Sequence, residues 1–219
     1  MLKQLSGLLL ATISSYSVAV EIYDDFPPTI HPDEEYVFYS HGLIVEGSDP
    51  RPVHPEFGTY EFPEIIRALF NEGSFNLVAH HRPAGTDPND YAAKLVGWVH
   101  QLVDSGVQPS SITLVGFSRG AQITLNASSQ LAQLGINTAV MAVCFDGDFP
   151  FSPAIELSGR VLSIYETSDT VRSCDAILAR SDEAVSTAEI AISTGKRHGA
   201  FYTPLSEWMV PLKAWLNEN

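Results

Sequence analysis

The sequence predicts an α/β fold in which a doubly wound, mostly parallel sheet of about six strands is covered by helices on both faces. Short apolar runs rich in β-branched residues alternate along the chain with longer segments of helical periodicity. This alternation is typical of parallel strands joined by crossover helices. The chain has 219 residues, of which 45% are hydrophobic and 17% charged, so we expect one globular domain with one sizeable core.

Six segments have the length and composition of buried strands. They are YVFYS (36–40), FNLVAH (75–80), ITLVG (112–116), AVMAVC (139–144), RVLSIYE (160–166) and EIAIST (189–194). Three helices are expected between or after them. Asp87 and Pro88 form a helix start, and the helix runs to about residue 105 with apolar residues at helical spacing. A second helix follows residue 118 and ends at Gly135, and a third begins near Pro204.

The first residues resemble an export signal. Lys3 precedes an apolar run, and the segment SVA at 17–19 places small residues where leader peptidases read them. We therefore predict a signal peptide over residues 1–19, cleavage after Ala19, and a mature domain over 20–219 that is secreted or periplasmic. The alternative is an uncleaved membrane anchor, but the apolar run is short for a bilayer span. We therefore expect no stable membrane insertion after cleavage.

Charge and cysteine content indicate which partners, cross-links and cofactors to expect. The formal net charge is −14, and it becomes −15 without Lys3, so nucleic acid is not an expected partner. Cys144 and Cys174 are the only cysteines, and in an exported chain an even number is compatible with one disulfide. Without a C-x-x-C motif or a histidine pair at zinc spacing, we expect no metal and no cofactor. The oligomeric state is not indicated.

Gly116-Phe117-Ser118-Arg119-Gly120 is a G-x-S-x-G motif. An apolar strand precedes it and a helical segment follows, so Ser118 falls on a sharp strand-to-helix turn. The small flanking residues let such a turn close and leave the serine oxygen exposed. The alternative is a structural turn serine, and it requires that no histidine or carboxylate lie at the matching strand ends.

Both partner types are present. Asp169 follows the strand 160–166 and His198 follows the strand 189–194, so their side chains and Ser118 are expected at one edge of the sheet. An imidazole can take the serine proton while a carboxylate holds the imidazole in the useful tautomer. Asp146, after the fourth strand, is the rival acid. Asp148, Glu166 and Asp175 are weaker alternatives.

An acyl-transfer site also needs backbone N–H groups that stabilise the developing oxyanion. One donor is expected from Arg119, directly after the serine. The other is expected from the loop SHGL after the first strand, and we predict the Leu43 N–H.

Together the segments YSHGL, VGFSRGA, YETSDT and KRHGAFY resemble the α/β-hydrolase superfamily, over nearly all of the mature chain. The resemblance implies a serine hydrolase with Ser118, Asp169 and His198 as its triad. Two departures stand out: residues 20–35 lack the usual first two antiparallel strands, and no large cap insertion is visible. The fold expected is therefore a minimal version without a cap domain.

The remaining polar candidates are less specific. His80 and His81 end the second strand near the predicted active edge, and together with Arg82 they are candidates for contact with substrate. His41 is a further candidate within the HG loop. A structural or solvated role is the alternative for each of them.

The predicted function is hydrolysis of a carboxylic ester or related acyl bond through an acyl-enzyme. Only residues 145–159 separate the fourth and fifth strands, and the Pro-rich segment 45–59 suits a rim better than a lid. We therefore expect an open site for small, soluble acyl substrates. A peptidase or acyltransferase with the same triad, or a binding protein on the same scaffold, are the alternatives.

Overall fold

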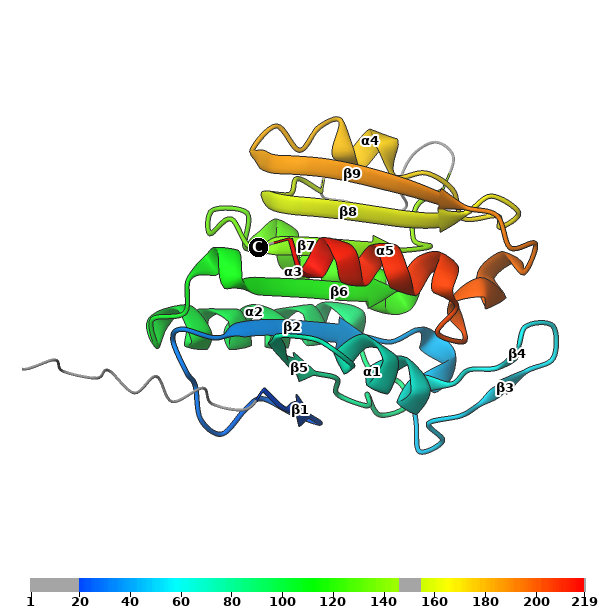
Figure 1. The fold of residues 1–219 in the computed structure, drawn as a ribbon, viewed down its shortest axis with the longest axis horizontal. Helices are drawn as coiled ribbons and strands as arrows, with labels where there is room; N and C mark the ends of the chain where they lie inside the picture. The colour runs from blue at the N-terminus through cyan, green and yellow to red at the C-terminus, as the bar shows by residue number, and fades with distance from the viewer. Residues whose placement is uncertain (1–19, 146–154, 219) are drawn as a thin grey trace, which may run out of the picture.

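The fold is known from a computed structural model, which describes residues 20–145 and 155–218. Seven parallel strands form one sheet in the order β1-β5-β2-β6-β7-β8-β9 (Figure 1). The strands are β1 (Ile22–Tyr23), β2 (Glu35–Ser40), β5 (Phe75–Val78), β6 (Ile112–Phe117), β7 (Asn137–Met141), β8 (Gly159–Glu166) and β9 (Ala184–Ile192). The predicted fold class is confirmed.

Helices cover both faces of the sheet. Side chains of β2 alternate between two cores: Val37 and Tyr39 pack with α1 (Phe62–Phe70) and α5 (Ser206–Leu216), whereas Tyr36 and Phe38 pack with α2 (Pro88–Asp104) and α3 (Arg119–Gln130). Figure 1 shows α1 and α5 in front of the sheet and α2 and α3 behind it. This two-sided burial explains why the strands read as continuous apolar runs.

The six predicted strands are present, with shifted ends. β7 ends at Met141 rather than at residue 144, because Ala142 adopts a positive φ of 48° that leaves the strand conformation. β9 begins at Ala184, five residues before the predicted start. The predicted helix after Ser118 ends at Gln130 rather than at 135. Such end shifts are set by neighbouring strands and turns, which local patterns do not contain.

Several elements were not predicted. β1 pairs with β5 through Ile22 and Leu77, but two residues are too few to give a periodic signal. α1 does carry a signal, since Pro63 lies in its first turn and its apolar residues follow helical spacing. The segment 45–59 contains an antiparallel hairpin formed by β3 (Val53–His54) and β4 (Gly58–Thr59). α4 (Asp175–Leu178) is a single turn.

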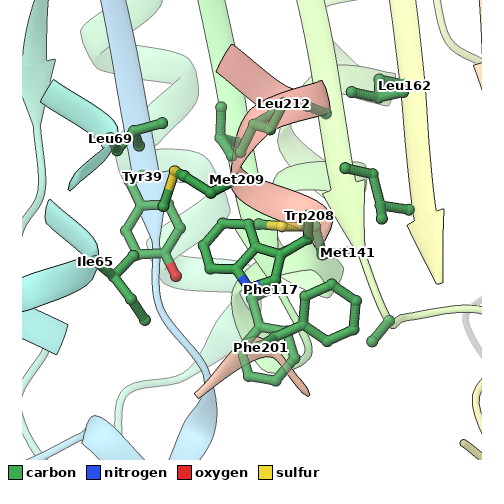
Figure 2. Packing of buried hydrophobic residues seen from close by; sticks show 14 of the residues in the cluster. Tyr39, Ile65, Leu69, Phe117, Met141, Leu162, Phe201, Trp208, Met209 and Leu212 are labelled. Carbon is green, nitrogen blue, oxygen red and sulfur yellow. The ribbon is translucent and has the colours of Figure 1, made fainter. Parts of the chain in front are cut away.

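The main core lies between the sheet and the helices α1 and α5, and it extends to the end of β6 at Phe117. Trp208 of α5 is fully buried, and its indole N–H donates to the Thr203 carbonyl at 3.0 Å. Its ring lies 6.0 Å from that of Phe201, which lies 5.3 Å from that of Phe117 (Figure 2). Phe117 precedes Ser118 and Phe201 follows His198 by three residues, so this core supports the backbone of both residues.

Within the described residues, no helix is long and apolar enough to span a membrane.

Candidate active site

Ser118 occupies the turn between β6 and α3 in a strained backbone conformation. Its φ of 54° and ψ of −119° lie in a region that residues other than glycine rarely adopt. Such a conformation costs on the order of 1–3 kcal/mol and persists only where the surrounding structure enforces it. The turn points the serine oxygen away from the core and places the first N–H groups of α3 beside it.

The two glycines of the motif are required by close packing. A Cβ at Gly120 would lie 1.9 Å from the Ser40 carbonyl oxygen, and a Cβ at Gly116 would lie 2.4 Å from the Gly120 carbonyl oxygen. Both distances are far below van der Waals contact, so neither position tolerates a side chain. The motif is thus explained by the close approach of α3 to the ends of both β2 and β6.

The structure brings Ser118, Asp169 and His198 together in one chain of hydrogen bonds. The Ser118 Oγ lies 2.9 Å from Nε2 of His198, and Nδ1 of the same ring lies 2.7 Å from Oδ2 of Asp169. Asp169 is 3% exposed and the His198 side chain 20% exposed. The imidazole can therefore accept the serine proton at one nitrogen while its other nitrogen donates to a buried carboxylate.

Hydrogen bonding keeps Asp169 ionised. Burial raises the pKa of this carboxyl group, but the hydrogen bond from His198 and the Thr170 N–H, 2.7 Å from Oδ1, outweigh burial and hold the pKa below its usual value. The rival acid, Asp146, and the weaker candidate Asp148 lie outside the described residues.

Two backbone N–H groups next to Ser118 have no acceptor among the described residues. They belong to Arg119, the first residue of α3, and to Leu43, the first residue of the short 3-10 helix η1 (Leu43–Val45). A Cβ at Gly42 would lie 3.0 Å from the Phe117 ring and 3.7 Å from the Ser118 Cβ, so this loop passes directly beside the serine. Gly42 itself has an ordinary φ of −68°, so its role is to supply space rather than an unusual turn.

A cleft of about 420 Å³ opens at Ser118 and His198. Much of its lining is apolar, from Leu43, Val143, Phe145 and Val171 among others. Such a surface suits the hydrocarbon part of a small substrate.

The other four candidates for substrate contact do not line this cleft. His41 is fully buried: Nδ1 lies 2.8 Å from the Gly42 carbonyl, and Nε2 accepts the Arg82 N–H at 2.9 Å. Burial, reinforced by the Arg82 charge, lowers the pKa of His41 well below 6.5, so the ring is neutral. The Arg82 side chain is also fully buried, 3.4 Å from the Glu46 carboxylate.

His80 and His81 line a separate cavity of about 550 Å³, together with Phe62 and Ile66. Each ring bonds to a backbone carbonyl, His80 to that of Asp24 at 2.8 Å and His81 to that of Val45 at 2.6 Å. Both histidines lie away from the Ser118 cleft because of the strand order: β2 lies between β5 and β6 and separates the end of β5 from the serine turn.

Among the cleft residues that the sequence patterns missed, two lie beside His198. Phe57, on the hairpin of segment 45–59, has its ring centroid 6.2 Å from that of His198 and lines the cleft. Arg197 also lines the cleft and forms an ion pair with Glu56 of the same hairpin. The hairpin thus forms one wall beside His198. Its position depends on how the loop folds back, for which the sequence carries no local signal.

Cys144 and Cys174 form a disulfide, in the pairing that the sequence suggested. Cys144 follows β7 and Cys174 precedes α4, and both are buried. Beside the bridge, the Arg172 N–H donates to the Cys144 carbonyl at 2.7 Å. The bridge therefore fastens the chain after the Asp169 loop to the end of β7.

No protein-family model matches the chain, and no curated protein matches it by sequence. The fold, in contrast, has counterparts among solved structures. An esterase from the bacterial hormone-sensitive lipase family aligns with a TM-score of 0.61 and 14% identity, over 88% of this chain and 79% of the other. An arylesterase aligns with a TM-score of 0.56 and 16% identity, over 87% and 78%.

A variant of SOBER1 from Arabidopsis thaliana aligns with a TM-score of 0.51 and 14% identity, over 83% of this chain and 97% of the other. With these likenesses and the sheet order described above, the chain has the α/β-hydrolase fold.

Proposed function

We propose that this protein is an exported serine hydrolase that cleaves carboxylic esters of small, soluble substrates through an acyl-enzyme intermediate. One observation carries the proposal: the hydrogen-bond chain from Ser118 through His198 to Asp169, built on a turn with a strained serine. Fold alone would not support an activity, because one fold hosts many functions. The named esterases among the structural counterparts are consistent with this choice.

In the proposed reaction, the Ser118 Oγ attacks the ester carbonyl while Nε2 of His198 takes the serine proton. The carbonyl oxygen becomes negatively charged and accepts hydrogen bonds from the Leu43 and Arg119 N–H groups. His198 then gives its proton to the leaving alcohol, and the C–O bond to that alcohol breaks. Water repeats the cycle on the acyl-enzyme, releasing the acid and restoring the serine. Asp169 stays ionised throughout and holds the imidazole.

The cleft supports small substrates. A volume of about 420 Å³ lies toward the lower end of the range for ligand pockets, and together with the lack of a large cap insertion in the sequence it supports short acyl or aryl esters. We therefore expect chromogenic esters to be hydrolysed fastest at short acyl lengths. Rates that rise steadily to long chains, with activation at a lipid surface, would instead indicate a lipase. Hydrolysis of amides but not esters would indicate a peptidase.

The central experiment compares wild type with Ser118→Ala and with Ser206→Ala, which changes an exposed serine at the start of α5. Two readouts are p-nitrophenyl butyrate hydrolysis and covalent labelling by a fluorophosphonate probe. Ser118→Ala should lose labelling and about 10⁴-fold or more of kcat, whereas the control should keep both. Full activity in folded Ser118→Ala protein would rule out the mechanism.

The identity of the acid is tested in the same assay. Asp169→Asn should lower kcat by about 10⁴-fold, because the amide stabilises the wrong imidazole tautomer. Asp146→Asn should have little effect. The reverse ranking would move the acid to the segment after β7.

Export through residues 1–19 is the remaining part of the proposal. The disulfide is compatible with an oxidising compartment. Mass spectrometry of the protein from the exported fraction of its producing cells should show a chain that begins at Val20. An intact Met1 in that fraction would contradict cleavage.

A further inference from the structure

Glu166 is a buried carboxylate that the proposed reaction does not use. It is the last residue of β8, and its exposure is 0%. Oε1 accepts hydrogen bonds from the Ser168 N–H at 3.1 Å and from the Ser168 hydroxyl at 2.9 Å. Oε2 accepts from the Thr194 N–H at 2.8 Å and from the Thr194 hydroxyl at 2.7 Å. Each oxygen thus serves a different residue.

These two residues belong to the two loops that carry the partners of Ser118. Ser168 directly precedes Asp169 in the loop after β8, and Thr194 lies four residues before His198 in the loop after β9. The paired register of β8 and β9 ends at Glu166 and Ile192, and one more backbone hydrogen bond follows, from the Thr167 N–H to the Ile192 carbonyl at 2.9 Å. Beyond that point, the hydroxyls of Thr167 and Ser193, 2.8 Å apart, join the two loops once, and the Glu166 carboxylate joins them through four hydrogen bonds.

The connection extends to the residue before the histidine. The Ser168 hydroxyl oxygen accepts the Arg197 N–H at 3.2 Å, and the Thr194 hydroxyl oxygen accepts the Lys196 N–H at 3.2 Å. Arg197 has a positive φ of 53°, a conformation that needs such support in a residue other than glycine. One carboxylate therefore organises the turn that presents His198.

Charge makes the arrangement strong. Burial raises the pKa of Glu166, but the hydrogen bonds from Thr194 and Ser168 outweigh it, and the pKa lies below its usual value. An ionised carboxylate accepts at both oxygens, and charge-assisted hydrogen bonds are about twice as strong as neutral ones. With its oxygens engaged by these four donors, and with Asp169 on the imidazole, Glu166 is not the acid of the triad.

We propose that Glu166 is a positioning residue, whose carboxylate clamps the Asp169 loop to the His198 loop and so fixes the alignment of imidazole and serine. The inference rests on the proposed function. Small displacements of a reacting group, of the order of 1 Å, lower rates by about 10²-fold, so a clamp at this point controls catalysis without touching substrate.

The test is Glu166→Gln. The amide keeps one acceptor oxygen but turns an NH₂ group toward either the Ser168 or the Thr194 donors, so one loop is released. We expect kcat for p-nitrophenyl butyrate to fall about 10- to 100-fold, with KM within about twofold, since the substrate-binding surface is unchanged. The matched control is Glu189→Gln. Glu189, on β9, accepts the Cys174 N–H at 2.7 Å and the Ser173 hydroxyl, and bonds to neither clamped residue.

A double-mutant cycle separates positioning from general stability. In the Asp169→Asn background, where the imidazole already holds the wrong tautomer and its alignment matters little, Glu166→Gln should lower kcat by less than threefold, on the order of the noise in such cycles. A purely structural contribution would lower kcat by the same factor in both backgrounds. If Glu166→Gln does not fold, the same measurements are made on Ser168→Ala and on Thr194→Val. Each of these variants removes one hydroxyl donor from the clamp.

Three outcomes would overturn the inference: an unchanged kcat in a folded variant, a change in KM alone, or equal effects in the two backgrounds. An unreactive serine in the wild-type protein would overturn the proposed function, and this inference with it. A reactive wild type with a fully active Glu166→Gln variant would overturn the inference alone.

Discussion

Breaking the bridge between Cys144 and Cys174 should destabilise the protein by an amount that loop length predicts. The two residues are 30 positions apart, and the closed loop includes the whole of β8. For a loop of this length the chain-entropy model gives about 3.5 kcal/mol at 25 °C, because the cross-link restricts the unfolded chain. For a chain of this size, that loss corresponds to a melting temperature lower by roughly 7–14 °C.

The assay is urea unfolding of the same protein with and without a phosphine reductant, followed by tryptophan fluorescence. Reduction keeps both sulfur atoms in the core, so it isolates the cross-link from packing. The Cys144→Ala/Cys174→Ala double variant is the control, and its unfolding midpoint should not respond to the reductant. Equal free energies of unfolding for oxidised and reduced wild type, or two free thiols in the non-reduced protein by mass spectrometry, would refute the reasoning.

Three further predictions concern stability. Gly120→Ala should prevent folding or destabilise strongly, because its Cβ would lie 1.9 Å from the Ser40 carbonyl, whereas Gly97→Ala, in open space on α2, should stabilise by about 0.5–1 kcal/mol in thermal melts. The buried, neutral His41 has a pKa well below 6.5, so below that pH the unfolded chain binds a proton at this residue that the folded protein does not. The contribution of His41 to the free energy of unfolding should therefore be constant above pH 6.5 and fall by up to about 1.4 kcal/mol per pH unit below it. A His41→Gln variant that kept this slope would contradict the assignment. Trp208→Ala should cost about 3–5 kcal/mol in urea unfolding through the cavity it leaves, and a loss under 1 kcal/mol would contradict the packing described.

Local patterns determined the fold class and the order of the main elements. Apolar runs and helical stripes predicted the sheet because burial on both faces leaves a direct record in composition. They did not determine β1, whose two residues pair with β5 only through the geometry of the sheet edge. They also missed the wall formed by Phe57, which depends on how the 45–59 hairpin folds back toward His198.

The sequence also determined which residue types follow which strands, and this predicted that Ser118, Asp169 and His198 would meet. The structure places them within hydrogen-bond distance, and their catalytic role remains the prediction that the variants test. Gly116 and Gly120 of the motif also indicated close packing, because the neighbouring backbone leaves no room for a Cβ at either position.

Only the tertiary structure decided among similar polar residues. His41 and His198 both follow strands, yet one is sealed between Gly42 and Arg82 while the other bridges the serine and a carboxylate. Glu166 reads from sequence as a minor alternative for the acid, but its position between two loops makes it a clamp. The physical reason is that burial and partners depend on which strand ends are neighbours, and strand order is a property of the whole fold rather than of any segment.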